Sequence, residues 1–463
     1  MIAAIRLKLG SLVRNGVVRS VGVLVGGTAF SQALALMALP LLTRLYTPSD
    51  FSVLAVYSSL LGIIGAVVCM RFEFAIPIPE RDEEAASLLV LALVSATVIA
   101  SAIGIAVLAF GSKLVVLLQR PDFEPYLWLL PVGVWVSGIY AALQYWSTRK
   151  KRFPVIARTR ITQSVGAIGV QMGYGLVAAG PFGLLFGQIV NSGAGSIGLA
   201  RAALRDDRHI LLSNSIRRMV VACRKYQKFP KCWTIEALVN AGGSQLPIVV
   251  IAALVAGPDV GLLLLAARVM TAPMGLIGGA VAQVYLSKAP EEKLAGRLDS
   301  FTANVIGGLI KTGVGPLVFV GAVAPLVFPI AFGQQWARAG AFVTYMTPWF
   351  VMQFVTAPVS MAFFVLERPN AALTLHLFGL MLRVGAVFFA VLVLETAVVE
   401  TYAAAGFIFY FVFFLVVVKV VGLRLRTVFI DCTSALGHLA FWIVAAVLAM
   451  MALTMLPADF FRG

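Results

Sequence analysis

Apolar runs of about 20 residues follow one another along nearly the whole chain, and a helix of that length crosses the hydrocarbon core of a bilayer. Of the 463 residues, 60% are hydrophobic and 12% are charged, whereas soluble domains carry about 25% charged residues. We therefore predict an all-α integral membrane protein with 12–13 transmembrane helices. The predicted spans are 21–43, 51–76, 85–109, 125–146, 160–179, 182–202, 232–256, 259–286, 302–330, 340–365, 370–394, 398–422 and 434–456.

Three prolines fall inside the two longest predicted spans of the C-terminal half. Pro273 lies in 259–286, and both Pro316 and Pro325 lie in 302–330. Because proline lacks a backbone donor and clashes with the preceding turn, we predict that these two helices are kinked or broken.

Lysine and arginine are distributed unevenly among the predicted loops, and this bias sets the orientation of the chain. With the N-terminus in the cytoplasm, 27 of the 36 basic residues fall in cytoplasmic segments, five in outer segments and four inside spans. The net charge of +16 is thereby explained by membrane topology, and we expect no nucleic-acid partner.

A basic cytoplasmic segment divides the predicted spans into two groups of six. We predict an N-terminal six-helix bundle over 1–202 and a C-terminal six-helix bundle over 232–422. Between them, 203–231 is predicted to be an amphipathic linker on the inner membrane surface, with a solvated linker as the alternative. Residues 423–463 add a basic cytoplasmic loop and one further span.

An internal repeat supports this division. TPSDFSVLA leads into the second span and GPDVGLLLLA leads into the eighth. Asp50 precedes the acidic pair Glu83-Glu84 by 33 residues, and Asp259 precedes the pair Glu291-Glu292 by 32. Since six spans separate the copies, the two halves are predicted to be related by a parallel pseudo-two-fold repeat.

Five of the ionisable residues inside predicted spans are candidates for function, because a charge there costs at least about 2.5–3.5 kcal/mol. Arg268, Lys311 and Arg383 fall near mid-bilayer, and their alternative role is a structural ion pair between helices. Arg71 and Glu73 lie near the cytoplasmic end of the second span, with an interfacial position as the alternative. We interpret the four cations as substrate-binding residues of a cavity for an anionic substrate, and Glu73 as an acid that pairs or takes up a proton.

Motifs for metal-dependent, nucleotide-dependent and serine-nucleophile catalysis are missing from the sequence. It contains no H-E-x-x-H, no G-x-x-x-x-G-K-[ST] and no G-x-S-x-G. The four cysteines and three histidines do not cluster at the spacing of metal ligands. We therefore expect a transporter without a cofactor or a metal site, and not an enzyme.

Six stretches carry a resemblance to a known family: PLLTRLYTPSDFSVLAVY (40–57), RFEFAIPIPERDEEA (71–85), WSTRKKRFPVIARTRI (146–161), KYQKFPKCWTIEALVNAGGSQLPIVV (225–250), GLLLLAARVMTAPMGLIGGAVAQVYLSKAPEE (261–292) and FGQQWARAGAFVTYMTPWFVMQFVTAPVS (332–360). Their ordered set resembles the polysaccharide-biosynthesis flippases of the Wzx type, in the multidrug/oligosaccharidyl-lipid/polysaccharide exporter superfamily. The resemblance implies two six-helix bundles around a central cavity, as in the MATE fold. The thirteenth span would be an addition to that twelve-helix core.

The resemblance also implies a function and a location. The expected activity is flipping of an undecaprenyl-diphosphate-linked oligosaccharide, an O-antigen, capsule or exopolysaccharide repeat unit, across the bacterial inner membrane by alternating access. Expected partners are this lipid-linked glycan, membrane lipid, and a glycan polymerase with other assembly proteins. Two alternatives remain open: a drug or cation antiporter of the same fold, and a non-transporting membrane scaffold for glycan assembly.

Overall fold

The computed structural model describes residues 16–212, 215–255, 257–366, 368–394, 397–423 and 425–454. Every regular element in these ranges is helical. The basic N-terminal residues 1–15, which are predicted to be cytoplasmic, lie outside the described residues, as do Arg424 and 455–463.

Nine described helices are long and apolar enough to cross a membrane. The number is ten if the two halves of one bent helix are counted as a single span. The chain is thus a multi-pass α-helical membrane protein. The remaining predicted spans coincide with α6 (Leu129–Arg149), α7 (Phe153–Val177) and the pair α8 (Phe182–Gly193) and α9 (Gly195–Asp206). These helices are not both long enough and apolar enough to be counted with the others.

Contacts divide the chain into two compact units. Unit 1 comprises Met1–Ala38, Leu60–Leu117 and Pro121–Leu238, and unit 2 comprises Leu39–Ser59, Leu118–Arg120 and Val239–Gly463. The boundary therefore cuts α2 (Gly16–Leu45) and α3 (Pro48–Gly65). Residues 39–59 have their contacts in unit 2 although they precede most of unit 1 in the sequence.

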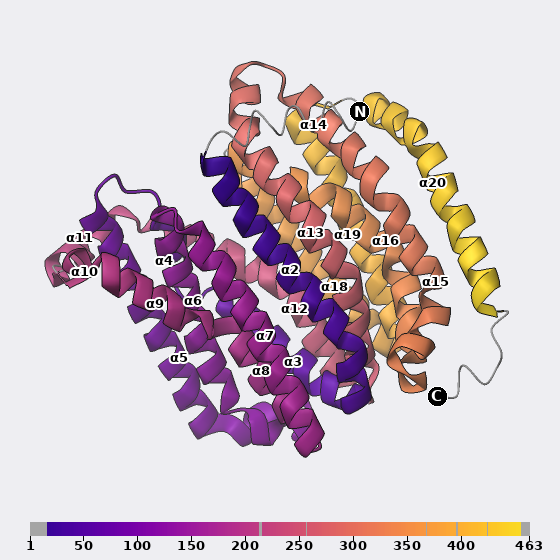
Figure 1. The fold of residues 1–463 in the computed structure, drawn as a ribbon, viewed down its shortest axis with the longest axis horizontal. Helices are drawn as coiled ribbons and strands as arrows, with labels where there is room; N and C mark the ends of the chain where they lie inside the picture. The colour runs from indigo at the N-terminus through magenta and orange to yellow at the C-terminus, as the bar shows by residue number, and fades with distance from the viewer. Residues whose placement is uncertain are drawn as a thin grey trace. The chain divides into compact units, whose positions relative to one another are not determined.

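Unit 1 is built from α5 (Asp82–Leu118), α6, α7, α8 and α9, with shorter elements between and after them (Figure 1). Helices α6 and α7 both pack against α8 and α9. Glycines allow this close approach, because a Cβ at Gly193 of α8 would overlap Val136 of α6 and a Cβ at Gly187 of α8 would overlap Gln171 of α7. The shorter elements are α4 (Phe72–Ala75), η1 (Pro121–Tyr126), α10 (Arg208–Leu212), α11 (Ile216–Lys225) and η2 (Phe229–Trp233).

Unit 2 has α16 at its centre, in contact with α13, α15 and α19 (Figure 1). Aromatic side chains fill the places where glycines leave room, since a Cβ at Gly406 would overlap Trp349 and a Cβ at Gly313 would overlap Phe354. The last helix, α20, lies along α15. The unit's helices are α12 (Thr234–Leu254), α13 (Asp259–Leu294), α14 (Leu298–Leu309), α15 (Gly315–Phe332), α16 (Ala337–Val359), α17 (Ala362–Val365), α18 (Pro369–Phe389), α19 (Val398–Val421) and α20 (Leu425–Thr454), with the shorter η3 (Ile310–Val314), η4 (Gln334–Trp336) and η5 (Ala390–Leu394).

The predicted span 51–76 is not one continuous helix. Helix α3 ends at Gly65, turns follow, and α4 begins at Phe72. In the turns before α4, two successive non-glycine residues, Met70 (φ 49°) and Arg71 (φ 59°), take left-handed backbone conformations that a regular helix does not contain. The prediction of a regular helix through this segment was wrong, because no proline or glycine marks those two positions.

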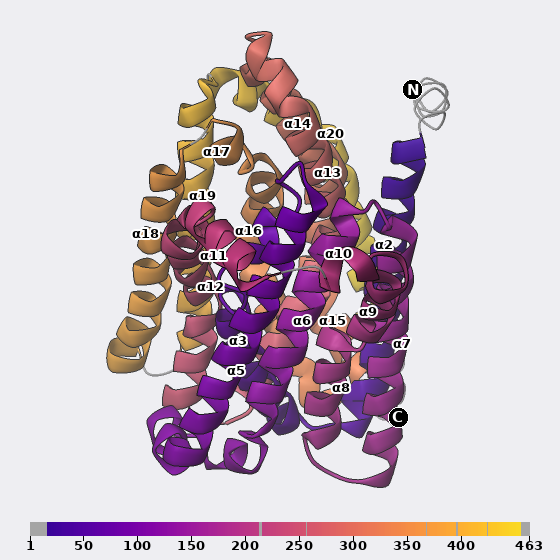
Figure 2. The same cartoon turned by 90° about the vertical axis from the view of Figure 1, so that its left-hand side faces the viewer.

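The predicted kink is confirmed in the first proline-containing span, whereas the second continues through a π-helical turn. Helix α13 bends by 44° between its halves Asp259–Gly275 and Ile277–Leu294, shortly after Pro273. The span 302–330 contains the π-helical turn η3, which immediately precedes Gly315 and Pro316. Figure 2 shows α13 reaching a tight turn and the chain returning as α14.

The two copies of the sequence repeat meet inside unit 2. The backbone N–H of Gly261, at the start of α13, donates to the buried Ser52 hydroxyl in α3 at 2.9 Å. A Cβ at Gly261 would collide with the Pro48 carbonyl. Nearby, the Trp336 indole donates to the carbonyl of Thr43 at 3.1 Å and its ring packs edge-on against Phe51. The first turns of these repeated helices therefore pack directly against each other, through contacts that involve backbone atoms.

The predicted linker 203–231 contains two short helices, α10 and α11. Ser215 caps α11 and accepts a hydrogen bond from the backbone of Arg218. Apolar Ile216 and Val221 are exposed on α11 together with its arginines. At the end of the helix, Lys225 pairs with Glu84 of α5 at 2.5 Å, and this hydrogen bond raises the pKa of Lys225. The helix is amphipathic in composition and anchored to unit 1 at one end.

Candidate functional site

Arg71 and Glu73 lie in the short connection of unit 1 between α3 and α5. The Arg71 backbone precedes α4 in the left-handed conformation, and its guanidinium lies 4.6 Å from the centre of the Phe74 ring. Such a cation–π contact holds the group without neutralising its charge. Arg71 and Glu73 form no ion pair with each other in the described structure.

Glu73 is buried, with 5% of its surface exposed, and its Oε2 atom has no hydrogen-bond partner. It lies between the spans Pro48–Gly65 and Asp82–Leu118. Burial raises the pKa of its carboxyl group to about 7, while the backbone and Arg71 act in the opposite direction. The group can therefore gain or lose a proton near neutral pH.

Arg268 lies in the first half of α13, one turn before Pro273 and the bend. Its side chain is half-buried and forms no ion pair with any described carboxylate. The hydroxyl of Thr271 donates to the carbonyl of Ala267 at 2.8 Å, one turn earlier. Arg268 is thus a mid-helix cation in unit 2 whose charge is not neutralised by a protein acid.

Lys311 lies within η3, the π-helical turn between α14 and α15. Its side chain is exposed, and η3 contacts α16 and α20. A π-turn shifts the side chains that follow it relative to a regular helix, and such turns are frequent at functional sites. As with Arg268, no carboxylate within the described ranges pairs with Lys311.

Arg383 is the most enclosed of the predicted cations, with 3% of its surface exposed. Its Nε donates to the carbonyl of Gly379 at 3.0 Å, and its guanidinium lies 4.4 Å from the centre of the Phe409 ring in α19. A Cβ at Gly243 of α12 would come within 3.0 Å of the guanidinium. Arg383 therefore joins α12, α18 and α19, and no ion pair of the described residues includes it.

The structure separates the predicted residues into two groups. Arg71 and Glu73 belong to unit 1, whereas Arg268, Lys311 and Arg383 belong to unit 2. Within unit 2 the three cations lie on α13, η3 and α18, and no described contact joins any two of them. What they share is the lack of a carboxylate partner.

Sequence reasoning missed the part played by Arg149, which was counted only as a loop charge. Its Nε donates to Asp82 Oδ1 at 2.9 Å, and its Nη1 donates to the Pro79 carbonyl at 2.5 Å. Its Nη2 donates to the Glu80 carbonyl at 3.2 Å, and Lys150 reaches the other oxygen of Asp82 at 2.6 Å. Arg149 therefore fixes the connection that follows α4, and only the tertiary fold reveals this role.

A second ion-pair group ties α6 and α7 to the end of α9. Arg152 pairs with Asp207 at 2.9 Å and with Asp206 at 3.2 Å. The buried Trp146 indole also donates to Asp207, at 2.9 Å. The run RKKR at 149–152 is thus largely engaged by acids of unit 1, in contrast to the predicted cavity cations.

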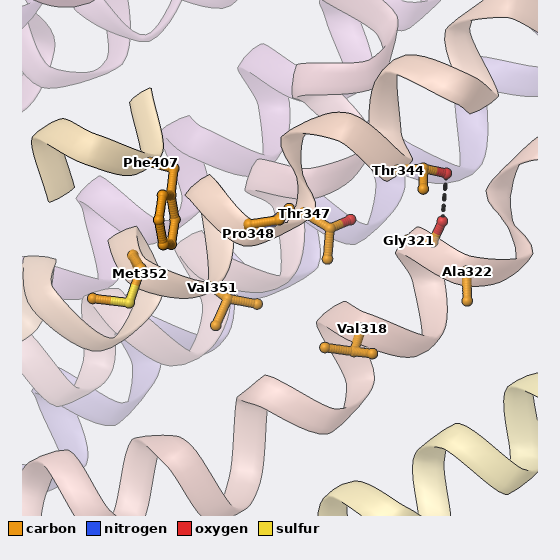
Figure 3. Close-up of a pocket in the computed structure, with 9 residues that line it drawn as sticks. All are labelled: Val318, Gly321, Ala322, Thr344, Thr347, Pro348, Val351, Met352 and Phe407. Atoms are coloured by element: carbon orange, nitrogen blue, oxygen red, sulfur yellow. Dashed lines mark hydrogen bonds between the residues drawn. The ribbon is translucent and has the colours of Figure 1, made fainter. Parts of the chain in front are cut away.

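An apolar groove lies between α15, α16 and α19 within unit 2 (Figure 3), with a volume of about 470 Å³. Its two hydroxyls are already engaged, because Thr344 donates to the Gly321 carbonyl and Thr347 to the Val343 carbonyl, both at 2.7 Å. Such a lining suits hydrocarbon. The groove is lined by Val318, Gly321, Ala322, Thr344, Thr347, Pro348, Val351, Met352 and Phe407.

Comparison with known proteins gives a family and a fold. A family model described as "Polysaccharide biosynthesis protein" matches residues 41–341. No curated protein matches the sequence.

Solved structures of two transporter types are similar to this chain. A lipid II flippase MurJ in an inward closed conformation is 12% identical, with a TM-score of 0.66, covering 94% of this chain and 98% of that one. An inward-facing multidrug resistance MATE family transporter of the MOP superfamily is 16% identical, with a TM-score of 0.60, covering 86% and 94%. An outward-facing MATE family transporter is 14% identical, with a TM-score of 0.56, covering 88% and 95%. The predicted MATE-like fold is therefore confirmed.

Proposed function

Because this chain belongs to the polysaccharide biosynthesis protein family and has the fold shared by MATE transporters and MurJ, we propose that it is a flippase for lipid-linked glycans. It would act in the bacterial inner membrane with its N-terminus in the cytoplasm. Its substrate would be an undecaprenyl-diphosphate-linked oligosaccharide that supplies O-antigen, capsule or exopolysaccharide. The chain would serve as a transporter and catalyse no covalent step.

One observation carries the anionic character of the proposed substrate. Arg71, Arg268, Lys311 and Arg383 fall inside predicted spans and have no carboxylate partner among the described residues, whereas the loop cation Arg149 is paired with Asp82. Keeping an unpaired cation in or near the membrane is costly. A diphosphate arriving with each substrate would offset that cost through charge-assisted hydrogen bonds.

The candidate cations would play different parts. Arg71 and Arg268 are half-buried and Lys311 is exposed, so each is proposed to contact the diphosphate at a stage of its transport. Arg383 is enclosed by Phe409 and the Gly379 carbonyl, so it would contribute positive potential and hold α18 against α19. The polyprenyl tail would remain in lipid, a glycan polymerase would act after release, and the two six-helix halves would move by alternating access.

Complementation of a flippase-null strain tests this proposal. Alanine variants of Arg71, Arg268 and Lys311 are expected to lower surface glycan at normal protein levels, because each removes a phosphate ligand. Arg81, which is exposed in the α4–α5 connection, provides a matched control whose alanine variant should complement fully. Full glycan display by the Arg71, Arg268 and Lys311 variants would refute the role of these cations.

A cation antiporter of the same fold is the second candidate, and Glu73 is the observation that favours it. A buried carboxyl group with a pKa of about 7 and an unpartnered oxygen could exchange a proton for a cationic solute. Export of ethidium from cells would depend on the protein and be lost in Glu73→Gln. Unchanged ethidium accumulation in cells with and without the protein would exclude this activity.

A further inference from the structure

Phe74 and Tyr145 form an aromatic pair in unit 1, beside the short helix α4. Their ring centres lie 4.8 Å apart with the planes tilted by 44°. Phe74 comes from α4 and Tyr145 from the last turns of α6, so the fold brings together residues that are distant in the sequence. Phe74 remains 41% exposed although the residues on either side of it in α4 are buried. A phenylalanine exposed to this extent offers a free apolar surface.

One arginine lies over the Phe74 ring, and a second interacts electrostatically with Tyr145. The Arg71 guanidinium lies 4.6 Å from the centre of the Phe74 ring. Arg160 of α7 is close enough to act electrostatically on Tyr145, as Arg71 and Glu73 are. Its guanidinium donates a hydrogen bond to the hydroxyl of Thr28, which is neutral. Neither arginine has a carboxylate partner in the described part of the chain.

Glu73 is the acid within this cluster, and it does not neutralise the arginines. Its Oε2 has no hydrogen-bond partner, and no ion pair involving it is formed within the described residues. Burial raises the pKa of the carboxyl group to about 7, so a large share of it is protonated at neutral pH. The cluster is therefore positively charged and has an apolar aromatic surface beside the charge.

The backbone at Arg71 indicates that its position is specifically required. Both Met70 and Arg71 have positive φ angles, 49° and 59°, although neither is glycine. A residue held in such a conformation costs on the order of 1–3 kcal/mol and persists where the surrounding structure demands it. From this turn the Arg71 guanidinium lies over the Phe74 ring.

We propose that Arg71, Phe74, Tyr145 and Arg160 form a subsite for the glycosyl diphosphate headgroup of the lipid-linked glycan. The first sugar would pack the C–H face of its ring on the exposed part of Phe74 beside the half-buried Tyr145, and the diphosphate would lie against the two guanidinium groups. This inference rests on the proposed function and deepens it. It adds Phe74, Tyr145 and Arg160 to the candidate residues, and it separates recognition of sugar from recognition of phosphate.

Two short-chain probes can test this separation on the full-length protein purified in detergent. The probes are neryl diphosphate and its glycosylated form, neryl-diphospho-N-acetylglucosamine, with binding measured by isothermal titration calorimetry. Phe74→Leu and Tyr145→Leu are expected to weaken binding of the glycosylated probe about tenfold, or about 1.4 kcal/mol, without affecting neryl diphosphate. Arg71→Gln and Arg160→Gln are expected to weaken binding of both probes about tenfold.

Matched controls exclude general effects. Arg158→Gln changes an exposed arginine of α7 two residues from Arg160, and Phe110→Leu changes an exposed phenylalanine elsewhere in unit 1. Both should bind the two probes like the wild type. Phe74→Tyr keeps an aromatic ring at this position and should bind the glycosylated probe like the wild type. That result would exclude misfolding as the cause of the loss in Phe74→Leu.

The outcomes also distinguish this inference from the proposed function. If the wild type binds both probes and the four variants bind them with the same affinity, the subsite is refuted and the proposed function is not. Equal losses in the control variants would overturn it as well. If the wild type binds neither probe, the proposed flippase function fails, and the subsite fails with it.

Discussion

A guanidinium group carries five N–H donors, and Arg149 directs its donors at one carboxylate and several backbone carbonyls of a single connection. The adjacent Lys150 shares the same carboxylate, that of Asp82. The sequence run RKKR predicts only that this segment is basic, because its acceptors lie about 70 residues earlier in the chain. Arg71 and Glu73 could be selected from the sequence, but their left-handed turn and aromatic neighbours could not.

Loss of the Arg149 side chain should destabilise unit 1. We expect Arg149→Ala to cost about 2–3 kcal/mol, because hydrogen bonds to charged groups contribute about 1.5–3 kcal/mol each and the freed carbonyls can partly rehydrate. The measurement is thermal unfolding in detergent. Arg158→Ala, at an exposed position in the same unit, should stay within about 0.5 kcal/mol of the wild type. Equal melting temperatures for the wild type and Arg149→Ala would contradict this account.

Glu73 predicts a specific pH dependence of stability. Its folded-state pKa, about 7, lies above the ordinary value of 4.5, so the folded state binds the proton more tightly than the unfolded state does. The associated stabilisation is present below pH 4.5 and is lost as the pH rises through 7. Melting temperatures measured from pH 4.5 to pH 8 should fall more for the wild type than for Glu73→Gln. Parallel curves would show that Glu73 does not titrate in this range.

At the scale of elements, the apolar runs predict most of the described helices, because length and hydropathy directly limit what can cross a bilayer. Proline also predicts the bend in α13. The break between α3 and α4 was missed, since left-handed non-glycine residues such as Met70 have no local sequence signal. The contact between the two repeat copies was also beyond prediction, because the repeat indicates symmetry without showing where its copies meet.

The close contact at Gly261 yields a prediction for the addition of a single methyl group. Gly261→Ala is expected to lower the melting temperature and glycan complementation, because its Cβ would collide with the Pro48 carbonyl, which is backbone and cannot rotate away. Gly308 in α14 has open space around the position of a Cβ, so Gly308→Ala should be tolerated. If both variants behave like the wild type, the packing of α13 against α3 is looser than described.

At the scale of the whole molecule, the family and the fold rest on the match over residues 41–341 and on the similarity to MATE and MurJ structures. The sequence could predict this class, since ordered apolar spans and a repeat extend through the chain. It could not predict that residues 39–59 belong to the second compact unit, because they make their contacts with helices more than 200 residues away. The transported solute is inferred from chemistry: unpaired cations and an aromatic surface fit a glycosyl diphosphate.

Translocation in proteoliposomes tests the flippase proposal most directly. A fluorescent undecaprenyl-diphosphate-linked oligosaccharide is incorporated into both leaflets, and dithionite, which does not cross the bilayer, is added outside. With the wild-type protein, fluorescence should fall almost to zero because inner-leaflet molecules reach the outside. Arg71→Gln and Arg268→Gln should retain close to the half that protein-free vesicles keep. Retention of half the fluorescence by vesicles containing the wild-type protein would contradict the account.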